Sequence, residues 1–387
     1  GHDQAQCLHC SHPCPSGQDH GPRLCHGDDR LVQLAHLQAL KPLCAICLGQ
    51  GAQNHIALSR SDLGDDEQVL QGLLQCPVCG MEYPIIDGIP VLLPKLREWV
   101  QGSLFHLIKR HDLSHSLDSL LGDCSGPDGA WESTRATLSC YGWDHWGEYM
   151  DGQDSACPPG AVRSLSKTLT EMRPCQTGPL IDVGCGPGGS THSFALAHPE
   201  RLVVGVDMNF SLLQAGHRIM AGQGELPLRQ EGVVHHWHAV RRPEPAPNLA
   251  LWCADARLLP FAPGSFGGAS SLNVVDSVDN PLQHILELAR VLDHGASAWL
   301  SSPFDWSTRA THVAQWLGAH SQRGDHGGDS RKVFLGMLER GVLPFQLHAE
   351  RQGDWRLRTG ARSHTRYQVW LAALEKGEQI AVAETGV

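Results

Sequence analysis

The sequence predicts a mixed α/β protein in which a small cysteine-rich β module precedes a parallel sheet that ends in an antiparallel hairpin. Two observations carry this prediction. From about residue 163, short apolar runs typical of strands alternate with helical stretches, the pattern of a parallel sheet with crossover helices. Before that point, eight of the fourteen cysteines lie in the first 79 residues, and six of these eight form Cys-x-x-Cys pairs.

The chain of 387 residues is long enough for several structural units. Shifts in composition divide it into a cysteine- and histidine-rich segment (1–35), a metal-binding β module (36–98), a helical and aromatic cap (99–162) and an α/β domain (163–387). We expect a helix over 96–109 at the start of the cap.

The charge and hydropathy of the chain exclude several classes of protein. A net charge of −11 and a pI near 6.1 argue against a surface that binds nucleic acid through its phosphates. No apolar run approaches the length of about 20 residues that spans a bilayer, and the first residues lack the pattern of a signal peptide. We therefore expect a soluble, cytoplasmic protein with no membrane partner.

The cysteine pairs predict a structural zinc site. Cys44, Cys47, Cys76 and Cys79 supply four thiolates, which close a tetrahedral site and leave no open position for catalysis. Two disulfides are disfavoured in a cytosolic chain. A second zinc site could use Cys7, Cys10, Cys14 and Cys25, with His9, His12, His20 and His26 as substitutes. An iron–sulfur cluster or a loose terminal segment are the alternatives for these residues.

The elements of the α/β domain can be placed along the chain. Expected strands are 179–183, 202–207, 249–254, 269–273 and 297–301, expected helices are 211–220 and 281–292, and two longer strands at 345–356 and 363–374 form the hairpin.

A glycine-rich turn follows the first of these strands. Asp182 ends the strand, and Gly184, Gly186 and Gly188 lead into a helix, so the backbone can approach a nucleotide and the helix N-terminus favours a carboxylate. Asp207 ends the next strand, where it can accept both ribose hydroxyls. The motif Cys253-Ala254-Asp255-Ala256 ends the third strand, where a carboxylate can accept the adenine amino group.

This order of motifs resembles the class I S-adenosylmethionine (SAM)-dependent methyltransferases over roughly residues 163–376. A nicotinamide-binding turn and a turn that merely packs helix on strand are the alternatives. The resemblance implies a Rossmann-like, seven-stranded class I methyltransferase sheet with an antiparallel C-terminal hairpin, SAM as the cofactor and methyl transfer as the reaction. The cofactor-binding residues that it implies are Asp182, Gly184, Cys185, Gly186, Gly188, Asp207, Met208, Asp255, Ala256 and Asn273.

The second cysteine pair and the residues after it carry another resemblance. Residues 76–94, with their Tyr-Pro-Ile and Asp-Gly-Ile-Pro stretches, resemble the small zinc-ribbon protein that activates several RNA and protein methyltransferases. The resemblance implies a zinc ribbon fused in cis, through which a protein partner could dock.

Residues 273–318 are similar to the methyltransferases of ovothiol biosynthesis, which methylate the imidazole of a mercaptohistidine. The similarity rests on Asn273-x-x-Asp276 and on the pattern Ser-Pro-aromatic-x-Trp, then Thr, then Trp-Leu-Gly. It implies a small polar metabolite or peptide acceptor with a sulfur or imidazole group. An RNA or protein methyltransferase that docks its substrate on the zinc module is the alternative, although no basic groove is visible beyond Arg229, Arg241 and Arg242.

Four residues are candidates for the acceptor side of the site. Asp276 follows the fourth strand and could contact the acceptor or cap a helix. In the polar loop 320–329, Arg323 could pair with a carboxylate and His320 could move a proton, unless the loop is simply solvated. Tyr141 could cover the cofactor or pack the cap on the domain.

Overall fold

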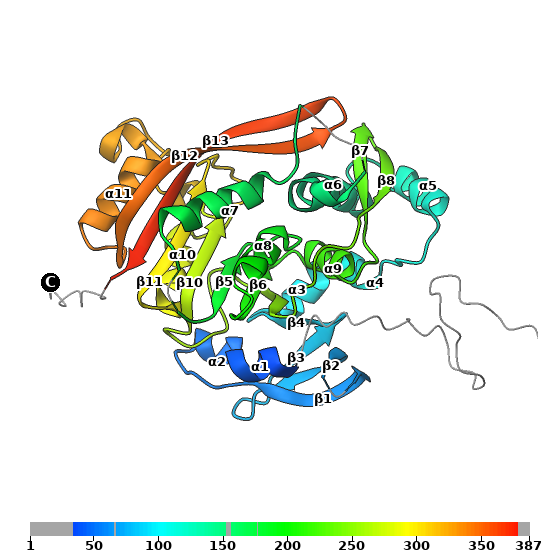
Figure 1. Ribbon diagram of the computed structural model, residues 1–387, viewed down its shortest axis with the longest axis horizontal. Helices are drawn as coiled ribbons and strands as arrows, with labels where there is room; N and C mark the ends of the chain where they lie inside the picture. Colours follow the sequence, from blue (N-terminus) through cyan, green and yellow to red (C-terminus); the bar gives the residue numbers. More distant parts are fainter. Residues whose placement is uncertain (1–33, 66, 152–155, 176, 378–387) are drawn as a thin grey trace, which may run out of the picture.

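The computed structural model describes residues 34–65, 67–151, 156–175 and 177–377 (Figure 1). Its first part is a small module of short helices and a four-stranded antiparallel meander. The elements of this module are α1 (Leu34–Leu40), α2 (Ala45–Gly49), β1 (Ala57–Gly64), β2 (Val69–Gln75), β3 (Glu82–Ile86) and β4 (Ile89–Leu92).

Helices follow the module. They are α3 (Leu96–Gly102), α4 (Leu104–Ile108), α5 (His115–Ser125), α6 (Ala130–Trp146) and α7 (Ala161–Met172). The expected helix over 96–109 is divided between α3 and α4, because Gly102 and Ser103, residues of low helix propensity, end the first of them. Nowhere in the described parts of the chain is a helix long and apolar enough to cross a bilayer.

The α/β domain alternates strands and helices as expected. Its elements are β5 (Leu180–Val183), α8 (Gly189–Ala197), β6 (Val203–Asp207), α9 (Phe210–Met220), β7 (Glu225–Glu231), β8 (Val234–Ala239), β9 (Leu249–Ala254), β10 (Phe266–Leu272), α10 (Pro281–Val291), β11 (Leu292–Ser302), α11 (Ser330–Glu339), β12 (Phe345–Gly360) and β13 (Ser363–Lys376). Short 3-10 turns lie at Gly147–Tyr149, Val313–Gln315 and Asp325–Gly328.

The main sheet has eleven strands in the order β1-β2-β3-β4-β9-β6-β5-β10-β11-β13-β12. Strands β9, β6, β5, β10 and β11 are parallel, and β13 and β12 complete the sheet as the antiparallel hairpin. The sheet is larger than the seven strands expected because the module joins it. Strand β4 pairs in parallel with β9, with Val91 opposite Cys253 and Leu92 opposite Ala254.

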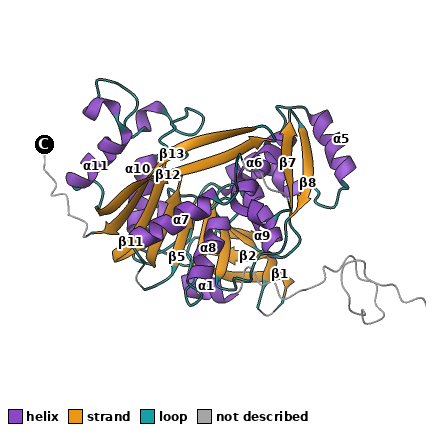
Figure 2. Ribbon diagram, turned by 45° about the horizontal axis from the view of Figure 1, so that its top comes forward, coloured by secondary structure: helices purple, strands orange, loops and turns teal. Residues whose placement is uncertain are grey.

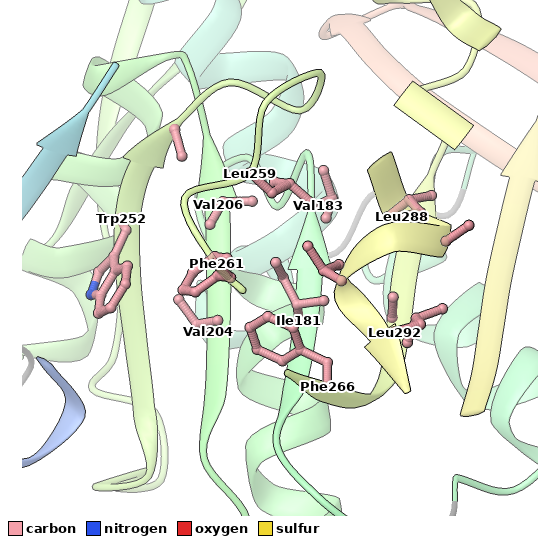
Figure 3. Packing of buried hydrophobic residues seen from close by; sticks show 14 of the residues in the cluster. Ile181, Val183, Val204, Val206, Trp252, Leu259, Phe261, Phe266, Leu288 and Leu292 are labelled. Atoms are coloured by element: carbon pink, nitrogen blue, oxygen red, sulfur yellow. The ribbon is translucent and has the colours of Figure 1, made fainter. Parts of the chain in front are cut away.

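Both faces of β5, β6 and β9 are buried, which explains their nearly continuous apolar sequences. Alternate side chains point to opposite faces. On one face, Ile181, Val204 and Trp252 pack with Phe261 and α10, as Figure 3 shows, in a cluster that extends into the cysteine module. On the other face, helices α6 to α9 cover the sheet. The shared core makes the module part of the same body as the domain.

The residues between α9 and β9 form a separate two-stranded hairpin, β7–β8, which lies beside α6 at one end of the molecule (Figure 2). The N–H of Arg229 donates to the Ser139 hydroxyl of α6 at 2.8 Å. The N–H of Ala361, in the β12–β13 turn, donates to the Gln230 carbonyl at 3.0 Å. Hydrogen bonds therefore link the hairpin to both α6 and the long C-terminal strands.

Candidate cofactor and metal sites

The turn after β5 is built from glycines with left-handed backbone. Gly184, Gly186 and Gly188 have φ angles of 75°, 53° and 81°, a region that side chains with a Cβ rarely adopt. A Cβ on Gly184 would also lie 2.2 Å from Cγ2 of Val274. The glycine spacing seen in the sequence therefore reflects both backbone conformation and close packing.

Asp182 stabilises this turn from within the sheet. Its carboxylate accepts hydrogen bonds from the hydroxyls of Ser190 at 2.6 Å, Thr191 at 2.8 Å and Ser270. Burial raises the pKa of Asp182, and the three hydroxyls oppose that shift. The side chain thus ties β5 to α8 and β10.

Asp207, at the end of β6, faces the turn. Its Oδ2 accepts the N–H of Gly186 at 2.8 Å, and its Oδ1 accepts the N–H of Asn209 at 2.8 Å. Burial raises the pKa of the carboxyl, and these N–H donors oppose the shift. Asp207 therefore orients the glycine turn as well as presenting a carboxylate beside it.

Asp255, after β9, forms an ion pair with Arg257. The guanidinium Nε donates to Asp255 Oδ1 at 2.9 Å, and Nη2 donates to Oδ2 at 2.6 Å. Arg257 also binds Asp279 through Nη1. The positive charge of Arg257 is therefore shared by two carboxylates.

A cavity of about 550 Å³ lies against the turn. The predicted residues that line it are Tyr141, Gly184, Gly186, Asp207, Met208, Asp255, Ala256, Asn273 and Asp276. Asp182, Cys185 and Gly188 lie behind this wall, and the first two are buried in the core. His320 and Arg323 are exposed and do not line the cavity. The structure therefore brings nine of the predicted residues to one hollow and leaves the 320–329 loop outside it.

His145 also lines the cavity, although the sequence did not single it out. It is buried near the end of α6, and its Nδ1 accepts the N–H of Gly189 at 3.0 Å. Nε2 must then carry the proton, and it points toward Gly186, where an added Cβ would lie 3.5 Å from it. Burial lowers the pKa of His145 to about 3, so the ring is neutral. Its only sequence signal was its place among the aromatic residues 141–149.

The opposite end of the cavity is formed by Asp276 and the C-terminal strands. Asp276 is 4% exposed, and its Oδ2 accepts the N–H of Asp305 at 2.6 Å. Burial raises the pKa of Asp276, whereas the N–H of Asp305 lowers it. Trp355 and Tyr367, paired across β12 and β13, stack at 5.2 Å and also line this end. Only the hairpin register brings them here, 50 or more residues after Asp305.

The four predicted cysteine ligands meet in the module. The sulfur atoms of Cys44, Cys47, Cys76 and Cys79 all lie within 4.8 Å of one another, with Cys44 and Cys79 at 3.6 Å and Cys47 and Cys76 at 3.9 Å. A tetrahedral zinc ion with Zn–S bonds of about 2.3 Å would separate its sulfurs by about 3.8 Å. The donor set and its spacing therefore fit zinc.

The Tyr83 hydroxyl lies 3.1 Å from the sulfur of Cys44, and the N–H of Ile46 donates to the same hydroxyl at 3.2 Å. These contacts orient the first cysteine pair. The proposed second site, Cys7, Cys10, Cys14 and Cys25, lies outside the described residues.

Comparison with known proteins agrees with this geometry. A sequence model of the methyltransferase-domain family matches residues 181–300. An uncharacterized 37.1 kDa protein in transposon TN4556 of Streptomyces fradiae is 26% identical over 161 residues, which cover 41% of this chain and 39% of that protein. Trans-aconitate 2-methyltransferase of Methylobacterium nodulans is 28% identical over 116 residues, which cover 28% of this chain and 42% of that protein.

The chain spans about two fifths of the length of these curated relatives. Among solved structures, a SAM-dependent methyltransferase of Methanosarcina mazei matches 52% of this chain and 94% of its own, at 19% identity and a TM-score of 0.33. The family match begins in β5 and ends in β11, and so includes the glycine turn, Asp207, Asp255 and Asp276. Residues 181–300 of this chain therefore belong to a methyltransferase domain.

Proposed function

We propose that the protein transfers the methyl group of SAM to a small polar acceptor that binds between Tyr141 and Asp276. One observation carries the proposal: a single cavity, within the usual range of about 300–1,000 Å³ for small-molecule sites, is lined both by the glycine turn and by Asp276. SAM supplies an activated methyl group on its sulfonium. The protein has to hold the acceptor in line with that group and exclude water.

Different residues at the turn can bind different parts of the cofactor. Asp207 would accept the ribose hydroxyls, and Asp255 would accept the adenine amino group beside the exposed side chain of Met208. The Nε2–H of His145 and the N-terminus of α8 would bind the carboxylate of the methionine part. Gly184 and Gly186 leave the space that the cofactor needs.

The acceptor proposed here is a metabolite or peptide group that contains sulfur or imidazole, as the likeness of residues 273–318 to ovothiol-pathway enzymes suggests. The large rings of Tyr141, Trp355 and Tyr367 line the cavity and support a small acceptor. Trans-aconitate, named as the substrate of the Methylobacterium relative, would be a carboxylate acceptor. His320 and Arg323 would reach an acceptor only if their loop moved toward the cavity.

The cysteine module is proposed to be a zinc ribbon that has a structural role, because its four thiolates leave no position for a substrate. Methylation of RNA or protein docked on this module is the second candidate function, favoured by the exposed side chains of Val78 and Cys79 at its tip. We place the divisions of the chain near residues 35, 98 and 162.

Titration of the full-length protein with SAM by calorimetry tests the cofactor assignment. In Asp207→Ala, the dissociation constant should rise at least about tenfold, because a charge-assisted hydrogen bond contributes about 1.5–3 kcal/mol. His145→Asn keeps an acceptor for the Gly189 N–H but removes the Nε2–H. This variant should also raise the dissociation constant of SAM about tenfold.

Matched controls are Asp293→Ala and His294→Asn, two exposed neighbours on β11 that lie outside the cavity. Thermal unfolding would verify that each variant is folded. If folded Asp207→Ala binds SAM within about threefold of the wild type, the cofactor assignment is wrong.

A further inference from the structure

The charge of the cavity carries information about the acceptor. Six aspartates and one arginine line it. Two of the aspartates, Asp255 and Asp279, share the charge of Arg257. Asp207 faces the glycine turn. Within the described residues, Asp276 and Asp305, at the other end, form no ion pair with a cationic side chain, so the acceptor end has a surplus of negative charge.

Asp276 is the more unusual of these two groups. It is buried, and its Oδ1 forms no hydrogen bond of good geometry within the described part of the protein, although the nearby Ser302 hydroxyl lowers the pKa of the carboxyl. A buried carboxylate oxygen without a partner is costly, and most such atoms in folded proteins are paired. The nearby charge of Asp305 adds repulsion and contributes to the raised pKa of Asp276, of which burial is the main cause. A positively charged donor would relieve both costs.

Aromatic rings complete the surroundings of these carboxylates. Tyr367 stacks on Trp355, and a hydrogen bond with Asp305 adds to burial in raising the pKa of its hydroxyl. Tyr141 also lines the cavity. Burial is the main cause of the raised pKa of Tyr141, and the charge of Tyr367 makes a smaller contribution. Carboxylates beside the rings of tyrosine and tryptophan form a typical site for a cationic nitrogen group.

Resting on the proposed function, we infer that the methyl acceptor carries a protonated nitrogen group, an ammonium, imidazolium or guanidinium, that binds Asp276 and Asp305 against Tyr367. Carboxylate acceptors are rejected, because the one arginine in the cavity is already shared by Asp255 and Asp279. The class of acceptor is then a nitrogen base rather than any small polar molecule.

Calorimetry on the full-length protein loaded with S-adenosylhomocysteine tests this inference. The cationic probes are tyramine, histamine and agmatine. The uncharged 4-ethylphenol matches tyramine without its ammonium, and trans-aconitate is the anionic probe. At least one cationic probe should bind about tenfold more tightly than trans-aconitate, and tyramine should bind more tightly than 4-ethylphenol. The affinity for the best cationic probe should fall about tenfold in Asp276→Asn and in Asp305→Asn, whereas Asp293→Asn should leave it unchanged.

Three results would overturn the inference while S-adenosylhomocysteine still binds. These are tighter binding of trans-aconitate than of every cationic probe, absence of binding by all three cationic probes, and unchanged affinity in both cavity variants. Thermal unfolding verifies that the two variants are folded. If one of them does not fold, the affinity of the other still tests the inference. Loss of S-adenosylhomocysteine binding by the wild-type protein would instead contradict the proposed function on which the inference rests.

Discussion

Asp144 and His145 are adjacent residues of α6 whose side chains both line the cavity. Burial shifts the pKa of each side chain in the direction that favours its neutral form. Burial raises the pKa of Asp144 to about 6, although hydrogen bonds from Trp355 at 2.8 Å and from the N–H of Val162 at 3.1 Å oppose the shift. Burial lowers the pKa of His145 to about 3. The two groups therefore affect the stability of the fold in opposite directions as the pH falls.

The raised pKa of Asp144 predicts a specific pH dependence. The folded state holds this proton more tightly than the unfolded chain, so the contribution of Asp144 to the free energy of unfolding is present at low pH and is lost as the pH rises through about 6. Relative to Asp144→Asn, the free energy of unfolding of the wild type should fall by up to about 3 kcal/mol between pH 4 and pH 7. Urea unfolding of both proteins at several pH values measures this difference.

The comparison between the two proteins isolates Asp144, because His145 titrates in both. Asp293→Asn controls for the loss of one exposed carboxylate. A difference in unfolding free energy that stays constant across the pH range would show that Asp144 does not titrate near 6.

At the scale of single elements, the cysteine module depends on ligands from two separate turns. One pair lies at the start of α2, and the other lies between β2 and β3. The module is small and shares its core with the domain, so we expect a bound zinc ion to supply part of its folding free energy.

Metal analysis of the purified protein should therefore find at least one zinc ion per chain. The double variant Cys44→Ser, Cys76→Ser should contain one zinc ion fewer and should unfold at a lower temperature. Cys124→Ser, which changes an exposed cysteine away from the cluster, should keep both the zinc content and the unfolding temperature. A wild-type protein that contains no zinc would rule out the metal assignment.

At the scale of the whole molecule, the module and the domain share one sheet and one core. Strand β4 pairs with β9 immediately before Asp255, and the side chain of Val91 is fully buried beside this pairing. The fold of the module should therefore influence the cofactor site, although no cysteine of the cluster lines the cavity.

Val91→Asp tests this coupling, because it buries an unpaired charge next to β9, at a cost of several kcal/mol. The module and the domain should unfold together at a lower temperature, and the affinity for SAM should fall. Val78→Asp, at an exposed position of the same module, is the matched control. Independent folding of the two parts would be evident if Val91→Asp kept the domain's unfolding transition and its SAM affinity.

Periodicity and glycine spacing are local properties, and they were sufficient to place the parallel strands, the C-terminal hairpin and the turn at Gly184. The order of Asp182, Gly186, Asp207 and Asp255 likewise predicted that one edge of the sheet would hold the cofactor. The structure places these residues near one edge because the carboxyl ends of neighbouring parallel strands meet there. The cysteine spacing predicted the four-sulfur cluster for a similar reason, since each pair is held within one turn.

Other features depended on contacts between residues far apart in the chain. The sequence did not indicate that β4 would extend the sheet, that His145 would face Gly186, or that Tyr367 would meet Asp305. It also did not show that His320 and Arg323 lie outside the cavity. The sequence by itself therefore determined the edge of the sheet that holds the glycine turn and the four-cysteine cluster, whereas only the tertiary structure decided the end of the cavity around Asp276, because its residues are brought together by strand register and helix packing.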